Sequence, residues 1–171
     1  MTTRTARRVS LPPAGARVRG FSLVETVVTI SIVAVLAAIA TPSMTTTMAR
    51  HRVQDAASDL SAVLLKARAD ALTLNSDISV LPVGGNWAAG WRIADPVNTG
   101  KSLQVHERAQ LVAITQSSGT SITYQFNGRI RGGVGVKFNV SSSVTVGKST
   151  TKCIAVDPSG RPYTQDGACS G

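Results

Sequence analysis

One long apolar segment near the N-terminus limits what this chain can fold into more than any other feature. Residues 21–41 read FSLVETVVTISIVAVLAAIAT, in which Glu25 is the only charged side chain. About 20 helical residues span roughly 30 Å, the thickness of a bilayer's hydrocarbon core. The residues before the segment are basic and contain no acid; their arginines are Arg4, Arg7, Arg8, Arg17 and Arg19. Under the positive-inside rule this leader stays in the cytoplasm, and everything after Pro42 lies outside.

The apolar segment fits three kinds of N-terminal signal, which differ in where the chain is cut. Ala38-Ile39-Ala40 offers the A-x-A site of an ordinary secretory signal, and Arg7-Arg8 resembles a twin-arginine signal in poorly fitting surroundings. The third possibility is a cut before the segment, between Gly20 and Phe21. A carboxylate in such a segment costs about 3 kcal/mol on insertion, so it normally has a function or a partner. An ordinary signal peptide has no use for Glu25, which therefore favours the third interpretation.

The residues around this cut resemble the N-terminus of type IV pilins and type II secretion pseudopilins. Gly20-Phe21-Ser22-Leu23-Val24-Glu25, the apolar run and Pro42 match that family in order and spacing. The resemblance implies that a prepilin peptidase cuts after Gly20, that Phe21 becomes an N-methylated terminus, and that Glu25 serves assembly. Glu25 lies too close to its own α-amino group for a relaxed ion pair, so a neighbouring subunit's amine is its expected partner.

The same resemblance implies where the protein is found and what it contacts. It predicts an inner-membrane protein with a single span and a periplasmic C-terminal domain before assembly. After assembly the expected location is a pilus at the cell surface, where the partners are other pilin subunits.

A second helical segment is expected after the apolar run. Pro42 should loosen or kink the helix, because proline removes a backbone donor. Beyond it, apolar residues recur every three or four positions to about Leu74, which predicts an amphipathic helix. The apolar stripe is expected to pack on a sheet and comprises Val53, Ala57, Leu60, Leu64, Ala67, Ala71 and Leu74.

From Asp77 onward the helical period stops and short runs rich in β-branched residues follow. Such runs, separated by Gly, Asn, Ser and Pro clusters, predict antiparallel strands and hairpins; they read ISVLPV, WRIAD, SLQVHE, LVAIT, SITYQF, VGVKFNV and TKCIAV. The predicted fold is α+β, a pilin fold with one long helix packed on an antiparallel β-sheet domain. The expected divisions are a cleaved leader at 1–20, a helix at 21–75 with its transmembrane part at 21–44, and an extracytoplasmic β-rich domain at 76–171.

A narrower resemblance covers the end of the helix and the first strands. Residues 65–75, followed by a strand and by Trp87-Ala88-Ala89-Gly90-Trp91, resemble the GspH/FimT minor pilin family. The two tryptophans are expected to be core aromatics with a structural use.

Side chains suited to catalysis or metal binding are scarce. Cys153 and Cys169 lack CxxC spacing, and in an extracytoplasmic domain they are expected to form a disulfide worth about 3 kcal/mol. His51 and His106 are the only histidines, so no metal-ligand cluster is expected. The sequence has no Ser/His/Asp arrangement, no recognisable carboxylate pair and no phosphate-binding glycine pattern. We therefore expect neither an enzyme nor a cofactor.

Positive charge gathers in the C-terminal part of the chain. The net charge is +9, and no acidic residue occurs between Glu107 and Asp157. A basic region of this kind suggests a polyanionic partner. The plain alternative is a surface kept soluble by its charge.

Two expected hairpin turns in this region end in Gly-Arg. Asn127-Gly128 favours a type I′ turn, and the two arginines that follow, Arg129 and Arg131, are two residues apart and share a face. Asp157-Pro158-Ser159-Gly160 suits a type I turn, after which comes Arg161. Arginines on loop tips can form forked hydrogen bonds with phosphate oxygens.

FimT-like members of the family that serve DNA uptake carry a DNA-binding Gly-Arg-x-Arg motif near the C-terminus. Gly128-Arg129-Ile130-Arg131 has the full pattern but lies earlier than expected, whereas Gly160-Arg161-Pro162-Tyr163 has tyrosine for the second arginine. The resemblance implies a minor pilin that binds DNA nonspecifically during natural transformation. The expected DNA-binding residues are Arg161, Arg129, Arg131, Lys148 and Lys152. The alternative is a GspH-like pseudopilin of a type II secretion system, with a structural role in assembly and no DNA binding.

Overall fold

The computed structural model describes residues 20–107, 109–144 and 150–170, without the side chains of residues 39–43. The predicted leader therefore lies outside the described residues, except for Gly20. Helix α1 (Leu23–Leu74) is followed by eight strands: β1 Ile78–Val83, β2 Asn86–Ala94, β3 Ser102–His106, β4 Val112–Gln116, β5 Ile122–Tyr124, β6 Val136–Ser142, β7 Thr151–Val156 and β8 Pro162–Asp166. By internal contacts the chain divides into two units, Met1–Ile39 and Ala40–Gly171.

The first unit contains the N-terminal part of α1, whose described side chains, up to residue 38, are all exposed. The Thr26 N–H donates to the Ser22 carbonyl oxygen at 3.1 Å, which starts the helical hydrogen bonding. The hydroxyls of Thr29 and Ser31 donate to carbonyl oxygens one turn earlier, so these polar groups are satisfied within the helix. Phe21 and Leu23 are 78% and 79% exposed. The N-terminal part of α1 therefore has an exposed apolar surface, which is typical of a segment that contacts lipid or an apolar protein partner.

In the described part of the chain, no helix combines the length and the hydropathy needed to cross a membrane. The membrane span over residues 21–44 stays a prediction. The side chains of residues 39–43, in the last part of the predicted span, lie outside the described set.

In the second unit α1 continues to Leu74 without an interruption at Pro42. The predicted apolar stripe is buried at six of its seven positions, and Ala49, Ala56 and Val63 extend it. Leu74 is the exception and is 50% exposed, because the helix ends there. Asn75 has φ +46°, and the Ser76 N–H donates to the Ala71 carbonyl oxygen at 3.2 Å. This left-handed cap stops the helix where the sequence predicted.

The strands form two separate antiparallel sheets, which together make up the predicted β-rich domain. The first has the order β3-β2-β1-β5 and the second the order β4-β6-β7-β8. All seven predicted runs contribute a strand; β2 begins earlier, at Asn86, and β8 is an additional strand. Strand β6 shows the alternation expected of a strand with one inward face, because Val136, Phe138 and Val140 are buried and the residues between them are partly exposed.

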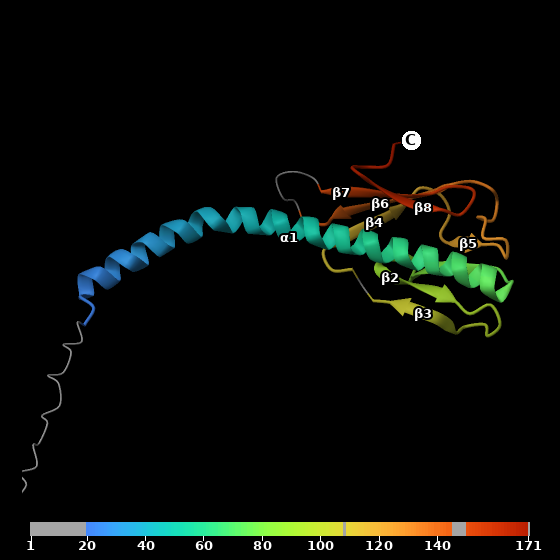
Figure 1. Ribbon diagram of the computed structural model, residues 1–171, viewed down its shortest axis with the longest axis horizontal. Helices are drawn as coiled ribbons and strands as arrows, with labels where there is room; N and C mark the ends of the chain where they lie inside the picture. Colours follow the sequence, from blue (N-terminus) through green and yellow to red (C-terminus); the bar gives the residue numbers. More distant parts are fainter. Residues whose placement is uncertain (1–19, 108, 145–149, 171) are drawn as a thin grey trace, which may run out of the picture. The chain divides into compact units, whose positions relative to one another are not determined.

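One hydrophobic core joins helix α1 to both sheets. It contains the helix stripe, Ile78, Trp91 and Tyr124 from the first sheet, and Phe138 and Ile154 from the second. Figure 1 shows the C-terminal part of α1 lying over the strands of both sheets.

Trp87 connects the sheets directly. Its ring meets Phe138 edge to face at 4.9 Å between centroids, and its Nε1–H donates to Gln116 Oε1 at 2.9 Å. Both tryptophans, Trp87 and Trp91, are buried, which confirms the structural role predicted for them.

Two leucines on the same helix test how strongly the core depends on the buried stripe. Leu60 is fully buried, whereas Leu65 is 52% exposed. We expect Leu60→Ala to lower the free energy of unfolding by about 2–5 kcal/mol, because it leaves a cavity between helix and sheets. The control Leu65→Ala should change it by no more than about 1 kcal/mol. Denaturant unfolding followed by tryptophan fluorescence measures both; equal losses would contradict the packing described here.

Candidate nucleic-acid interface

The first Gly-Arg turn runs from Gln125 to Arg129, directly after β5. The Gly128 N–H donates to the Gln125 carbonyl oxygen at 2.7 Å, and the Gln125 N–H donates to the Arg129 carbonyl oxygen at 2.8 Å. Gly128 has φ +74°, but Asn127 is not among the described residues with positive φ. A type I′ turn needs a positive φ at both central residues, so the predicted type I′ turn is wrong. Asn127 instead uses its side-chain oxygen to accept from the Arg129 N–H at 3.0 Å.

The second Gly-Arg turn, from Asp157 to Arg161, joins β7 to β8 and repeats the same pattern. The Gly160 N–H donates to the Asp157 carbonyl oxygen at 2.9 Å, as the predicted type I turn requires, and Gly160 has φ +84°. The Ser159 hydroxyl and the Arg161 N–H donate to the Asp157 carboxylate at 2.6 and 2.9 Å. These hydrogen bonds hold the pKa of Asp157 below its usual value. The Asp157 carboxylate is therefore ionised, and it accepts hydrogen bonds from residues of its own turn.

The two turns pack directly against each other, although they belong to different sheets. A Cβ placed on Gly160 would overlap the Gly128 carbonyl oxygen, so only glycine fits at this contact. The Ile130 N–H also points to the Pro158 carbonyl oxygen at 3.4 Å. The structure thus brings together two motifs that are far apart in the sequence.

Residues near the C-terminal end of helix α1 contact the first turn. Arg68 Nε donates to the Gly128 carbonyl oxygen at 3.0 Å. A Cβ on Gly128 would meet Arg68 and Leu72 at 3.3 Å, so the first turn lies close on the helix. Tyr124 is fully buried beneath the turns, where burial raises the pKa of its hydroxyl. Arg68 lies within residues 65–75, the stretch that resembles the GspH/FimT family. Nothing in the sequence indicated that it would contact Gly128.

The structure brings together only some of the predicted DNA-binding residues. Arg129 and Arg161 are exposed, and neither forms an ion pair within the described part of the chain. Arg131 is exposed too, but it pairs with Asp77. Lys148 lies outside the described residues.

Lys152 does not join the arginines. It pairs with Asp166 at 2.8 Å and lies at the start of β7, whereas Arg161 follows the end of that strand. Four strand steps between Lys152 and Val156 correspond to about 13 Å, so this lysine lies apart from the turn that carries Arg161.

The predicted disulfide between Cys153 and Cys169 is present and spans 16 positions. Its loop contains Arg161 and β8. The Cys169 N–H donates to Asn139 Oδ1 at 2.7 Å, which fastens the chain after β8 to β6. The disulfide therefore limits how far the second turn can move in partly unfolded states.

The predicted processing and assembly residues lie at the start of α1. Phe21 and Glu25 are exposed in the first unit, and Glu25 occupies the first helical turn. A carboxylate there is favoured by the helix dipole. Their proposed roles, and that of Gly20, stay predictions. Among the described residues no group of three or more His, Cys, Asp or Glu side chains could hold a metal ion.

The fold is that of the type IV minor pilins. It matches the crystal structure of the type IV minor pilin FimU of Pseudomonas aeruginosa (strain PAO1) in space group P21, with a TM-score of 0.58 and 20% identity, over 68% of this chain and 90% of that one. A second crystal form of FimU, in space group P65, matches with a TM-score of 0.55 and 20% identity, over 66% and 91%.

The sequence gives the family. Residues 56–160 match the family described as type II transport protein GspH, and residues 15–41 match the prokaryotic N-terminal methylation motif. This chain belongs to the GspH family. Among curated proteins, none is similar enough in sequence to count as a match.

Two glycines with similar backbone angles test the contact between the turns. Gly160 and Gly167 have φ +84° and +94°, but only a Cβ at Gly160 would meet other atoms. We expect Gly167→Ala to lower the free energy of unfolding by about 1 kcal/mol through backbone strain alone. Gly160→Ala should lower it by about 3 kcal/mol, because the turns must separate. Thermal unfolding by circular dichroism compares the two, and equal shifts would show that the contact is loose.

Proposed function

We propose that this chain is a minor pilin that is cut after Gly20, anchored by its N-terminal helix and assembled into a pilus, where it binds DNA nonspecifically. The family and the fold support the coarser part of this proposal, a minor pilin or pseudopilin. We accordingly expect a structural subunit rather than an enzyme, in keeping with the match to the GspH family.

The N-terminal part of the proposal rests on the methylation motif and the exposed apolar helix. The motif match at residues 15–41 includes Gly20, Phe21 and Glu25. We expect a prepilin peptidase to cut after Gly20 and the new terminus at Phe21 to be methylated. The apolar helix then lies in the inner membrane, with the second unit in the periplasm, until other pilin subunits cover it. Glu25 neutralises the terminal amine of a neighbour, because either charge alone would be costly in an apolar bundle.

The DNA-binding part rests on one observation: two exposed arginines, whose guanidinium groups form no ion pair with any described acidic residue, stand on turns that are packed together. Arg129 and Arg161 each follow a glycine in the left-handed region, so both project from a tight turn. The nearby Asp157 carboxylate is occupied by hydrogen bonds of its own turn. Guanidinium groups in such positions can bind phosphate oxygens of any sequence, and the affinity falls as salt rises.

Removing the arginines tests the proposal. The full chain, purified in detergent, should bind a duplex DNA at low salt, and its affinity should fall steeply across a salt series. Arg129→Ala and Arg161→Ala should each weaken binding about tenfold and make the salt slope shallower by about 1. Lys101→Ala, which removes an exposed cation of the β2–β3 connection, is the control and should leave the slope unchanged. An unsubstituted chain that does not bind DNA at low salt would refute the DNA-binding role.

The second candidate is a pseudopilin of a type II secretion system. The family description, type II transport protein GspH, favours it directly. Its partners would be other pseudopilins, and DNA would play no part. Co-purification with pseudopilins, together with a gene neighbourhood of secretion components and no DNA affinity, would establish this function instead.

A further inference from the structure

The Gly128 carbonyl oxygen is the point where three segments of the chain meet. It accepts a hydrogen bond from Arg68 Nε at 3.0 Å, and it lies against the Cα of Gly160, where no Cβ would fit. Arg68 belongs to helix α1, Gly128 to the turn after β5, and Gly160 to the turn between β7 and β8. Any shift of this carbonyl therefore moves both Gly-Arg turns.

We propose that Arg68 is a positioning residue that fixes the two turns relative to each other, so that Arg129 and Arg161 bind one nucleic-acid backbone as a pair. The inference rests on the proposed DNA-binding function and adds a residue and a mode of action to it. Two contacts held at a fixed separation reinforce each other, because the second binds at a high effective concentration once the first has formed.

The chemistry of Arg68 fits positioning better than a direct contact with phosphate. Its guanidinium is partly buried, and Nε is already engaged by the backbone. Arginine holds Nε–H in a rigid plane, so it can orient a carbonyl oxygen, whereas lysine offers only a flexible point charge. Arg68→Lys therefore keeps the charge at this position but loses the oriented donor.

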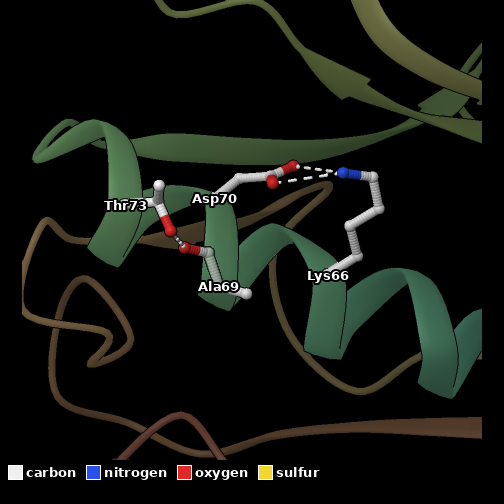
Figure 2. A network of polar contacts seen from close by, with 4 residues as sticks. All are labelled: Lys66, Ala69, Asp70 and Thr73. Carbon is white, nitrogen blue, oxygen red and sulfur yellow. Dashed lines mark hydrogen bonds and ion pairs between the residues drawn. The ribbon is translucent and has the colours of Figure 1, made fainter.

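Lys66 provides the matched control on the same helix. Figure 2 shows its ammonium group reaching Asp70, with Nζ to Oδ2 at 3.0 Å, one helical turn further on. Nearby, the Thr73 hydroxyl donates to the Ala69 carbonyl oxygen at 2.8 Å, again within the helix. Lys66→Met thus removes a cation two residues from Arg68 without touching either turn.

A double-mutant cycle on DNA affinity tests the pairing. In the full chain, Arg129→Ala and Arg161→Ala should each weaken binding about tenfold, and together they should weaken it far less than the product of about a hundredfold. In an Arg68→Lys background, the losses of DNA affinity caused by the two arginine substitutions should multiply. The Arg68→Lys variant itself should keep the salt slope of the unsubstituted chain, because the charge is unchanged. A Lys66→Met background should keep the coupling. Coupling that survives Arg68→Lys would overturn the positioning role.

Amide hydrogen exchange tests the same role without DNA. Arg68→Lys should speed exchange at the Gly128 and Gly160 amides together, and Lys66→Met should speed neither. Faster exchange at Gly128 alone would overturn the link between the turns. If the unsubstituted chain does not bind DNA, the proposed function fails and with it the pairing on a nucleic acid. The exchange data would then still decide whether Arg68 joins the turns.

Discussion

The burial of one helix stripe against two separate sheets is the interaction on which the rest of the domain depends. The stripe of α1 from Val53 to Ala71 shares a single core with residues of both sheets. Neither four-stranded sheet closes on itself, so each needs the helix to cover its apolar face. Trp87 adds a direct link, because it contacts Phe138 and Gln116 across the gap. Removing the helix stripe would leave two sheets with little to hold them together.

The contact between the Gly-Arg turns is a consequence of this arrangement. Each turn extends from its own sheet, and the two sheets are placed by the same helix. Near its C-terminal end that helix also supplies Arg68, which donates to the Gly128 carbonyl oxygen. Gly160 then completes the contact, because it alone has no Cβ to clash with that oxygen. The proposed nucleic-acid site therefore depends on core packing as much as on its own arginines.

Much of this structure could be predicted from local patterns. The helical period gave the buried stripe and the end of α1, and the β-branched runs gave seven of the strands, because periodicity reports which face a segment buries. Two predictions failed, one because of a local side-chain hydrogen bond and one because of the position of a lysine along a strand. Asn127-Gly128 suggested a type I′ turn, but a side-chain hydrogen bond to Arg129 stabilises another geometry. Lys152 was grouped with the arginines, yet β7 separates them and Asp166 holds it.

By itself, the sequence determined the apolar N-terminal helix with its single carboxylate, the α+β class and the pairing of the two cysteines. Each of these depends on residue type and on order along the chain. Only the tertiary structure decided that the strands split into two sheets, that two Gly-Arg turns meet, and that Arg68 reaches one of them. Residues 68, 128 and 160 come together because the core places three distant segments side by side, and no local pattern carries that information.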